Sequence, residues 1–471
     1  MNSQNQISHS LMSISSVDGR HYPDSQPLQA SLSEFAYHKY RSKAFVEYLK
    51  YICANPKISF AKTLPEKEIE LLDNLIENFS LENAIEINNI DRYGLNGNPP
   101  INHDLKAVEY FVKKHISDKQ IIELVHIGLT SEDINNLAQS YMFSSFNTEL
   151  LIPEIKQFAQ HLITLIDATK DVPMLSRTHG QPATPTTFGK EFANYLNRIT
   201  HIIKKLQSFT FEVKFSGAVG NHNAMHFAYP NLDWMQISSD FITSQNFAFT
   251  HFATQINLHD NLCEYLTLVA QLNNILCSLC QNTWQYISNH YFSQANVSGE
   301  VGSSTMPHKI NPWRIEVAEG LTRKSTRQIQ GFTESLAHSR FQRDLSDHET
   351  LRAIPIALAD TFVSIKHMQA EFKRLKPNSD QIQRELDTYP VVILEGYQTY
   401  LRVKGYTKPY ELFKDFSRGE NPTLVQIHDF LDSLDISDTD RNYLKSLSPQ
   451  TYIGYASTLA EKAIQEFNKL S

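Results

Sequence analysis

Residues 299–312, GEVGSSTMPHKINP, concentrate groups that bind anions and move protons. Hydroxyls, an imidazole, a fixed cation and an amide are carried by Ser303, Ser304, His308, Lys309 and Asn311. Two glycines free the backbone here, and two prolines stiffen the part that follows. This composition predicts a loop that closes over a charged substrate and excludes water. The alternative is an ordinary solvated connection between helices.

A second candidate lies in SRTHGQPATPTTFGKE, residues 176–191, where the helical pattern is interrupted. Its His179 stands between Thr178 and Gly180, just before a proline-containing break. An imidazole held in such a bend beside several hydroxyls is suited to proton transfer near neutral pH. The alternative is a histidine with a purely structural role.

Three short polar segments stand where the pattern predicts turns or helix starts: SVDGRH, INHDLKA and GLTSEDINN. The residues that they present are Arg20, His21, Asn102, His103, Asp104, Thr130 and Ser131. The first segment has the alternative of a surface turn, and the other two fit N-terminal caps, with Asp104 as the cap of its helix. Helix N-termini also bind anions, so capping and substrate binding are compatible.

The segment SRFQRDLSDHETLR, residues 339–352, carries Arg340, Arg343 and Arg352. Three guanidinium groups so close in sequence suit multidentate binding of carboxylate or phosphate. The alternative is a helix face on which these arginines pair with acidic residues of the same segment.

Long segments without proline or glycine must position these groups. In residues 258–288 apolar side chains recur every three to four positions, and a helix of that length spans roughly 46 Å. Residues 191–206 and 314–336 have the same character. The pattern predicts an all-α fold with a central long-helix bundle.

Breaks in the helical pattern divide the chain into three predicted domains. These are an N-terminal helical domain (1–120), the bundle domain (121–375) and a C-terminal helical domain (376–471).

The composition excludes several classes of protein. A hydrophobic content of 41% and a charged content of 20% describe a globular chain, and the net charge of −8 argues against general nucleic-acid binding. No apolar run is long enough for a membrane span, and the N-terminus lacks the pattern of a secretory signal, so a cytoplasmic location is expected. Cys277 and Cys280 form a CxxC inside a predicted helix without partners at metal-site spacing, so we expect no metal.

Taken together, GLTSED, THGQPATPTTFG and GSSTMPHKINP resemble the three signature patches of the fumarase/aspartase superfamily, in the same order. Within that superfamily the chain resembles the adenylosuccinate lyase family, especially its bacterial long form, because a histidine in MPHK is typical of it. Further segments are similar to the same family: SVDGR, NHDLKAVEYF, TSEDINN, GAVGN, TQI and QRDLSD. The resemblance covers nearly the whole chain.

This resemblance implies a cofactor-free β-elimination that releases fumarate from adenylosuccinate, giving AMP. It implies the same cleavage of the succinyl-carboxamide ribotide of purine synthesis. It also implies small-molecule nucleotide substrates and a homotetramer in which each active site is assembled from three chains.

The resemblance further assigns roles to individual residues. His179 matches the general acid and Ser303 the general base, while Lys309 and Asn311 are suited to stabilising the carbanion. Substrate-binding positions match Arg20, His21, Asn102, His103, Asp104, Thr130, Ser131, Gln255, Arg343, His348, Glu349, Thr350, Leu351 and Arg352.

Two residues depart from the family pattern: His21 replaces a tyrosine, and His348 replaces a small hydroxyl residue. Two alternative functions stay open. Another fumarate-releasing lyase, such as argininosuccinate lyase, is disfavoured by His308. A catalytically silent structural relative is disfavoured because the proposed acid, base and carbanion-stabilising residues are all present.

Overall fold

The computed structural model describes residues 10–94, 99–295, 305–306 and 308–470. Contacts between residues separate the chain into two compact units. Unit 1 comprises Met1–Glu154, Lys205–Asn273 and Leu321–Val363, and unit 2 comprises Ile155–Lys204, Asn274–Gly320 and Ser364–Ser471. The three domains anticipated from the sequence stay a prediction.

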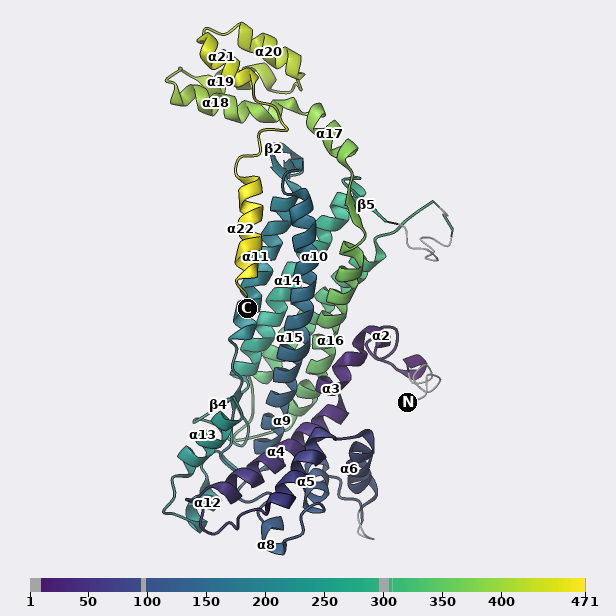
Figure 1. Cartoon of the computed structure of the whole chain (residues 1–471), viewed down its shortest axis with the longest axis vertical. Helices are drawn as coiled ribbons and strands as arrows, with labels where there is room; N and C mark the ends of the chain where they lie inside the picture. Colours follow the sequence, from purple (N-terminus) through teal and green to yellow (C-terminus); the bar gives the residue numbers. More distant parts are fainter. Residues whose placement is uncertain (1–9, 95–98, 296–304, 307, 471) are drawn as a thin grey trace. The chain divides into compact units, whose positions relative to one another are not determined.

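Helices predominate, which confirms the all-α prediction. The five long helices that contain a boundary between the units are α10 (Ile152–Thr169), α11 (Phe188–Gln207), α14 (Asp260–Ser288), α15 (Trp313–Leu336) and α16 (Ser346–Phe372) (Figure 1). The predicted helices at 258–288, 191–206 and 314–336 therefore exist, and their ends differ by at most three residues from the prediction.

Buried contacts hold these helices together within each unit. In unit 1, Asn273 of α14 donates to Ser325 of α15 at 2.9 Å, and Ser325 donates to the Ala357 carbonyl of α16 at 2.8 Å. In unit 2, the Phe372 ring of α16 meets Phe158 of α10 edge-on at 5.3 Å between centroids. The bundle core thus combines aromatic packing with hydrogen-bonded polar side chains.

Helix α4 is central to the rest of unit 1, and its first turn is capped by the Ser33 hydroxyl accepting from the Ala36 N–H at 3.2 Å. Helix α4 contacts α7 and α9. The helical segments of this unit are α2 (Tyr22–Ser25), η1 (Gln26–Leu28), α3 (Gln29–Leu32), α4 (Glu34–Ala54), α5 (Glu66–Glu77), α6 (Leu81–Tyr93), α7 (Asp104–Lys113), α8 (Lys119–Ile122), α9 (Ser131–Ser145), the π-helix η2 (Phe146–Leu151), α12 (Asn223–Ala228) and α13 (Trp234–Ser244).

Unit 2 adds shorter helices that follow α16 in the chain. They are α17 (Ser379–Thr388), η3 (Pro390–Ile393), α18 (Leu394–Val403), α19 (Pro409–Ser417), α20 (Leu424–Asp432), α21 (Asp438–Lys445) and α22 (Ala456–Asn468). Among the described residues, no helix has both the length and the apolar character that a membrane crossing needs.

Three small two-stranded sheets were not predicted from the sequence. Antiparallel pairs are formed by β1 (Pro173–Thr178) with β2 (Gln181–Thr187) and by β5 (Phe292–Gln294) with β6 (Leu375–Pro377), whereas β3 (Glu212–Val213) and β4 (Ala248–Phe249) are parallel. The first of these hairpins carries His179 in its turn.

Candidate active site

The N-terminus of α9 is fixed by a buried ion pair. Asp133 accepts from the Thr130 N–H at 2.8 Å, so Thr130 and Ser131 stand at a firmly held helix start. The same carboxylate lies 2.6 Å from the Lys214 ammonium, and both side chains are fully buried. Asp133 also accepts from the Ser216 N–H at 2.9 Å, which ties the segment after β3 to α9.

Gln255 and Arg343 meet at the same end of α9. The Arg343 guanidinium lies 2.8 Å from Glu132 and donates to the Gln255 side-chain oxygen at 3.3 Å. The Gln255 amide nitrogen donates to the Ala218 carbonyl at 3.1 Å. Two predicted substrate-binding residues, 88 positions apart, are therefore in direct contact.

The start of α7 differs in one respect from the expectation. The cap is His103, whose Nδ1 accepts from the Lys106 N–H at 3.3 Å, and Asp104 is the first helical residue. Asn102 precedes them with a φ of 50°, a left-handed conformation that asparagine tolerates. Because His103 caps the helix, the Asp104 carboxylate contacts two arginines instead.

Asp104 lies between Arg41 of α4 and Arg352 of α16. Its Oδ2 accepts at 2.9 Å from the Arg41 Nη1 and at 2.9 Å from the Arg352 Nη2. Burial by itself raises the pKa of Asp104, but the charge and hydrogen bond of Arg41 outweigh it and lower the pKa to about 2. Asp104 is therefore an anion throughout the neutral range, and it holds both guanidinium groups in place.

Arg41 extends this contact into a continuous network. Arg41 Nε donates to Asn135 at 2.9 Å, and Asn135 donates to Glu132 at 2.7 Å. Glu132 is the ion-pair partner of Arg343. An unbroken series of hydrogen bonds and one ion pair, which we call the arginine network, thus joins Arg352, Asp104, Arg41, Asn135, Glu132, Arg343 and Gln255.

The first turns of α16 carry the segment at 348–352. His348 Nε2 accepts from the Arg352 Nε at 3.3 Å, so its proton is on Nδ1, which faces Glu349 at 3.2 Å. The preceding residue, Asp347, accepts from His259 at 3.1 Å, and both side chains are buried. Thr350 lies 3.2 Å from Ser335, and Leu351 is buried in the core.

Arg20 and His21 lie in the turn before α2. Arg20 is exposed, and the His21 N–H donates to the Ser16 carbonyl at 2.9 Å. Burial lowers the pKa of His21, partly offset by the charges of Asp24 and Asp360, which favours the neutral imidazole.

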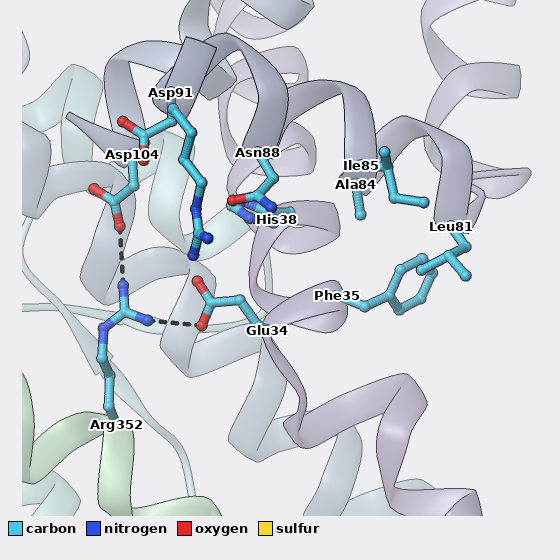
Figure 2. A pocket seen from close by; sticks show the side chains of 11 residues that line it. Glu34, Phe35, His38, Leu81, Ala84, Ile85, Asn88, Asp91, Asp104 and Arg352 are labelled. Carbon is cyan, nitrogen blue, oxygen red and sulfur yellow. Dashed lines mark hydrogen bonds and ion pairs between the residues drawn. The ribbon is translucent and has the colours of Figure 1, made fainter. Parts of the chain in front are cut away.

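A cavity of about 530 Å³ opens beside the arginine network (Figure 2). Figure 2 shows Arg352 between Asp104 and Glu34, with Phe35 and Leu81 on the apolar side. Helices α4, α6, α7 and α16 contribute its lining. Its volume lies in the range typical of small-molecule sites.

The predicted general acid, His179, belongs to unit 2. His179 and Gly180 occupy the two central positions of the β1–β2 turn, where Thr178 pairs with Gln181. Both central residues have positive φ values, 53° and 75°, as a tight type I′ hairpin turn requires. The turn exposes the His179 imidazole.

Lys309 is exposed, and its N–H donates to the Met306 carbonyl at 3.1 Å. The Asn311 carbonyl accepts from the Gln294 side chain at 3.5 Å. Ser303, the predicted base, lies outside the described residues. Among the described residues, no cluster of three or more histidine, cysteine or acidic side chains is arranged to hold a metal ion.

Comparison with known families matches nearly the whole chain. The family described as "Lyase" matches residues 26–331, and the family described as "Adenylosuccinate lyase C-terminal" matches residues 339–453. The chain belongs to the adenylosuccinate lyase family. Its C-terminal family match begins at the arginine-rich segment that contains Arg343 and Arg352.

Individual members of the family support the same assignment. The adenylosuccinate lyases of Haemophilus influenzae and Escherichia coli K12 are each 36% identical to this chain, covering 96% of it and 98% and 99% of their own lengths. That of Buchnera aphidicola from Acyrthosiphon pisum is 37% identical over 96% of this chain.

Solved structures extend the likeness in fold beyond this family. The 3-carboxy-cis,cis-muconate lactonizing enzyme of Pseudomonas putida aligns with a TM-score of 0.70 at 19% identity, covering 95% of this chain and 97% of that chain. The fumarate lyase of Mesorhizobium sp. BNC1 aligns with a TM-score of 0.69 at 16% identity, covering 93% and 97%. At these identities the comparison establishes the fold alone.

Three residues of the arginine network escaped sequence reasoning. Arg41 lies in EFAYHKYRSKAF, where it reads as one surface cation among several. Asn135 and Glu132 lie in GLTSEDINN, where the sequence predicts only a helix start. The signal that points to Arg41 is its helical spacing: it stands four positions after Tyr37 and four before Phe45, both of which are buried on the same side of α4.

Proposed function

We propose that this chain cleaves adenylosuccinate to AMP and fumarate, and cleaves the succinyl-aminoimidazole-carboxamide ribotide in the same way. The observation that carries the proposal is the 36% identity with adenylosuccinate lyases along 96% of the chain. The site chemistry supports it, because a substrate with two carboxylates and a phosphate needs several fixed cations, and the arginine network holds two that are partly exposed, Arg343 and Arg352.

The proposed reaction is a β-elimination. Ser303, deprotonated, removes the proton from the carbon next to the one that bears nitrogen, and the resulting carbanion delocalises into its carboxylate. Lys309 and Asn311 stabilise the charge that develops there. The carbon–nitrogen bond then breaks, and His179 gives a proton to the departing amine.

The unit 1 residues are proposed to bind the substrate. Arg343 and Gln255, beside Thr130 and Ser131, offer a cation, an amide and helix N–H groups to one anionic end. Arg352, across the arginine network, offers its guanidinium to another. Fixed donors at two places orient the substrate before proton transfer, and this removes an entropic barrier.

We further propose a homotetramer with shared active sites and a cytoplasmic location, both from the family resemblance. Sedimentation of the purified protein would test the assembly, because a tetramer has about four times the 54.0 kDa chain mass.

A direct assay tests the activity. Purified protein is mixed with adenylosuccinate, and AMP and fumarate are followed by ultraviolet absorbance and chromatography. Equal amounts of both products are expected. Argininosuccinate serves as the competing substrate, and cleavage of that compound alone would replace the proposed function.

A further inference from the structure

Two carboxylates occupy Arg352, and they come from different helices (Figure 2). The Asp104 Oδ2 accepts from Nη2 at 2.9 Å, while the Glu34 Oε2 accepts from Nη1 at 2.7 Å. Both ends of the guanidinium fork are therefore engaged. An incoming anion that takes both Nη groups in the bidentate manner therefore competes with these carboxylates.

The Asp104 side of this arrangement is fixed. Asp104 also accepts from Arg41, whose side chain is completely buried, and from the Leu105 N–H at 2.8 Å. Arg41 stacks on the Tyr37 ring at 3.6 Å. Removing Asp104 from Arg352 would leave the buried Arg41 without its carboxylate, which is costly.

The Glu34 side is held much more weakly. The Glu34 side chain is 52% exposed, and Arg352 is its one ion-pair partner among the described residues. It stands at the first position of α4, beside the cavity of about 530 Å³. An exposed pair of this kind contributes little binding free energy, so solvent or a ligand replaces it readily.

We propose that Glu34 is a displaceable stand-in for a ligand phosphate on Arg352, and that it thereby sets the affinity for the phosphoryl group. This rests on the proposed function, in which the ligand is a nucleotide monophosphate. A phosphate dianion carries more charge than a carboxylate and offers three oxygens to the same fork, so it displaces Glu34 where a neutral ligand does not. Glu34 is thus a specificity-determining residue that does not take part in the chemistry.

Replacing Glu34 tests the proposal without disturbing the core. In Glu34→Gln, AMP loses its competitor and binds about two- to fivefold more tightly by isothermal titration calorimetry, the range expected for an exposed ion pair. Adenosine, which lacks the phosphate, binds with unchanged affinity. With adenylosuccinate, KM falls by a similar factor and kcat stays constant.

Glu66→Gln is the matched control, because Glu66 is likewise an exposed glutamate at the first position of a helix, α5. It reproduces the loss of charge at a helix N-terminus and is expected to leave AMP affinity unchanged.

Weaker or unchanged AMP binding in Glu34→Gln would overturn the inference, as would an equal gain for adenosine. The proposed function fails separately, if the wild-type protein releases no fumarate while AMP binding still responds to the substitution. If the wild-type protein neither turns over adenylosuccinate nor binds AMP, both proposals are overturned.

Discussion

At the scale of single residues, His179 occupies an unusual backbone position. Its φ of 53° lies in the left-handed region, which costs a non-glycine residue about 1 kcal/mol or more, and asparagine tolerates it best. The preferred sequence for such a turn is Asn-Gly, yet the chain places His-Gly there. A residue that is disfavoured by the backbone but exposed to solvent is a reasonable candidate for chemistry.

We therefore predict that His179→Asn raises the thermal unfolding midpoint slightly and abolishes fumarate release. His179→Ala also abolishes turnover, but it lowers the midpoint because alanine is strained at the positive φ of this position. Calorimetry and the absorbance assay measure the two effects. Full activity in His179→Asn would remove His179 from the role of acid.

His38 gives a second prediction at this scale. It is buried on α4 near Glu34, Arg41, Asp104 and Arg352, and its Nδ1 has no hydrogen-bond partner among the described residues. Burial lowers the pKa of His38 from 6.5 to about 4, so the folded state resists protonation. Between these values the unfolded chain binds more protons, and stability falls as the pH falls.

In His38→Leu this loss disappears. Relative to the wild type, the variant is expected to gain up to about 3 kcal/mol in unfolding free energy between pH 6.5 and pH 4. Unfolding midpoints at several pH values test the prediction, with His201→Leu as the control at an exposed position. Parallel pH profiles for wild type and His38→Leu would contradict it.

At the scale of elements, the Lys214–Asp133 pair joins the segment after β3 to α9. The Lys214 ammonium also donates to the Gly217 carbonyl at 2.5 Å, so one buried cation serves two segments. Burial lowers the pKa of Lys214 and the charge of Asp133 raises it, and the net direction is downward. The pair is costly to desolvate, and neither partner tolerates loss of the other.

Lys214→Met is therefore predicted to destabilise the protein by about 3–5 kcal/mol, because Asp133 is left as an uncompensated buried charge. The double variant Lys214→Met/Asp133→Asn should recover part of this loss. Denaturant unfolding of the wild type, the single variants Lys214→Met and Asp133→Asn, and the double variant forms a double-mutant cycle. Additive losses would show that the two side chains are not energetically coupled.

The sequence predicted some elements well and others not at all. Helix α14 was predictable because 29 residues without proline or glycine keep one apolar stripe. The β1–β2 hairpin was not, because its second strand contains two prolines, which weaken any strand pattern. The His103 cap was missed because aspartate is the more common capping residue.

The candidate site shows the same division. His179, Arg343 and Arg352 could be proposed as site residues because their short segments contain unusual local chemistry. The role of Arg41 was not, since its contacts with Asp104 and Asn135 span 63 and 94 positions along the chain. Contacts over such separations depend on helix packing, which local spacing does not encode.

At the scale of the whole molecule, the proposed shared sites give a mixing experiment. His179→Ala and Ser303→Ala are each expected to be inactive and correctly assembled. If the acid and base of one site come from different chains, mixed tetramers contain some sites with both residues intact. Partial activity should therefore return after subunit exchange.

Mass spectrometry of intact assemblies verifies the exchange, and each variant incubated alone is the control. Exchange without any return of activity would argue that acid and base come from the same chain.

The arginine network carries an evolutionary constraint. Arg41 is enclosed, and its partners Asp104 and Asn135 each serve a further residue, so a change at one position leaves a polar group stranded elsewhere. Natural variation here should therefore be concerted: homologues that replace Arg41 should also differ at Asp104 or Asn135. Drift at the surface-exposed Glu34 carries no such penalty, so we expect this position to vary independently of the network and, through its proposed role, to change the affinity for nucleotides.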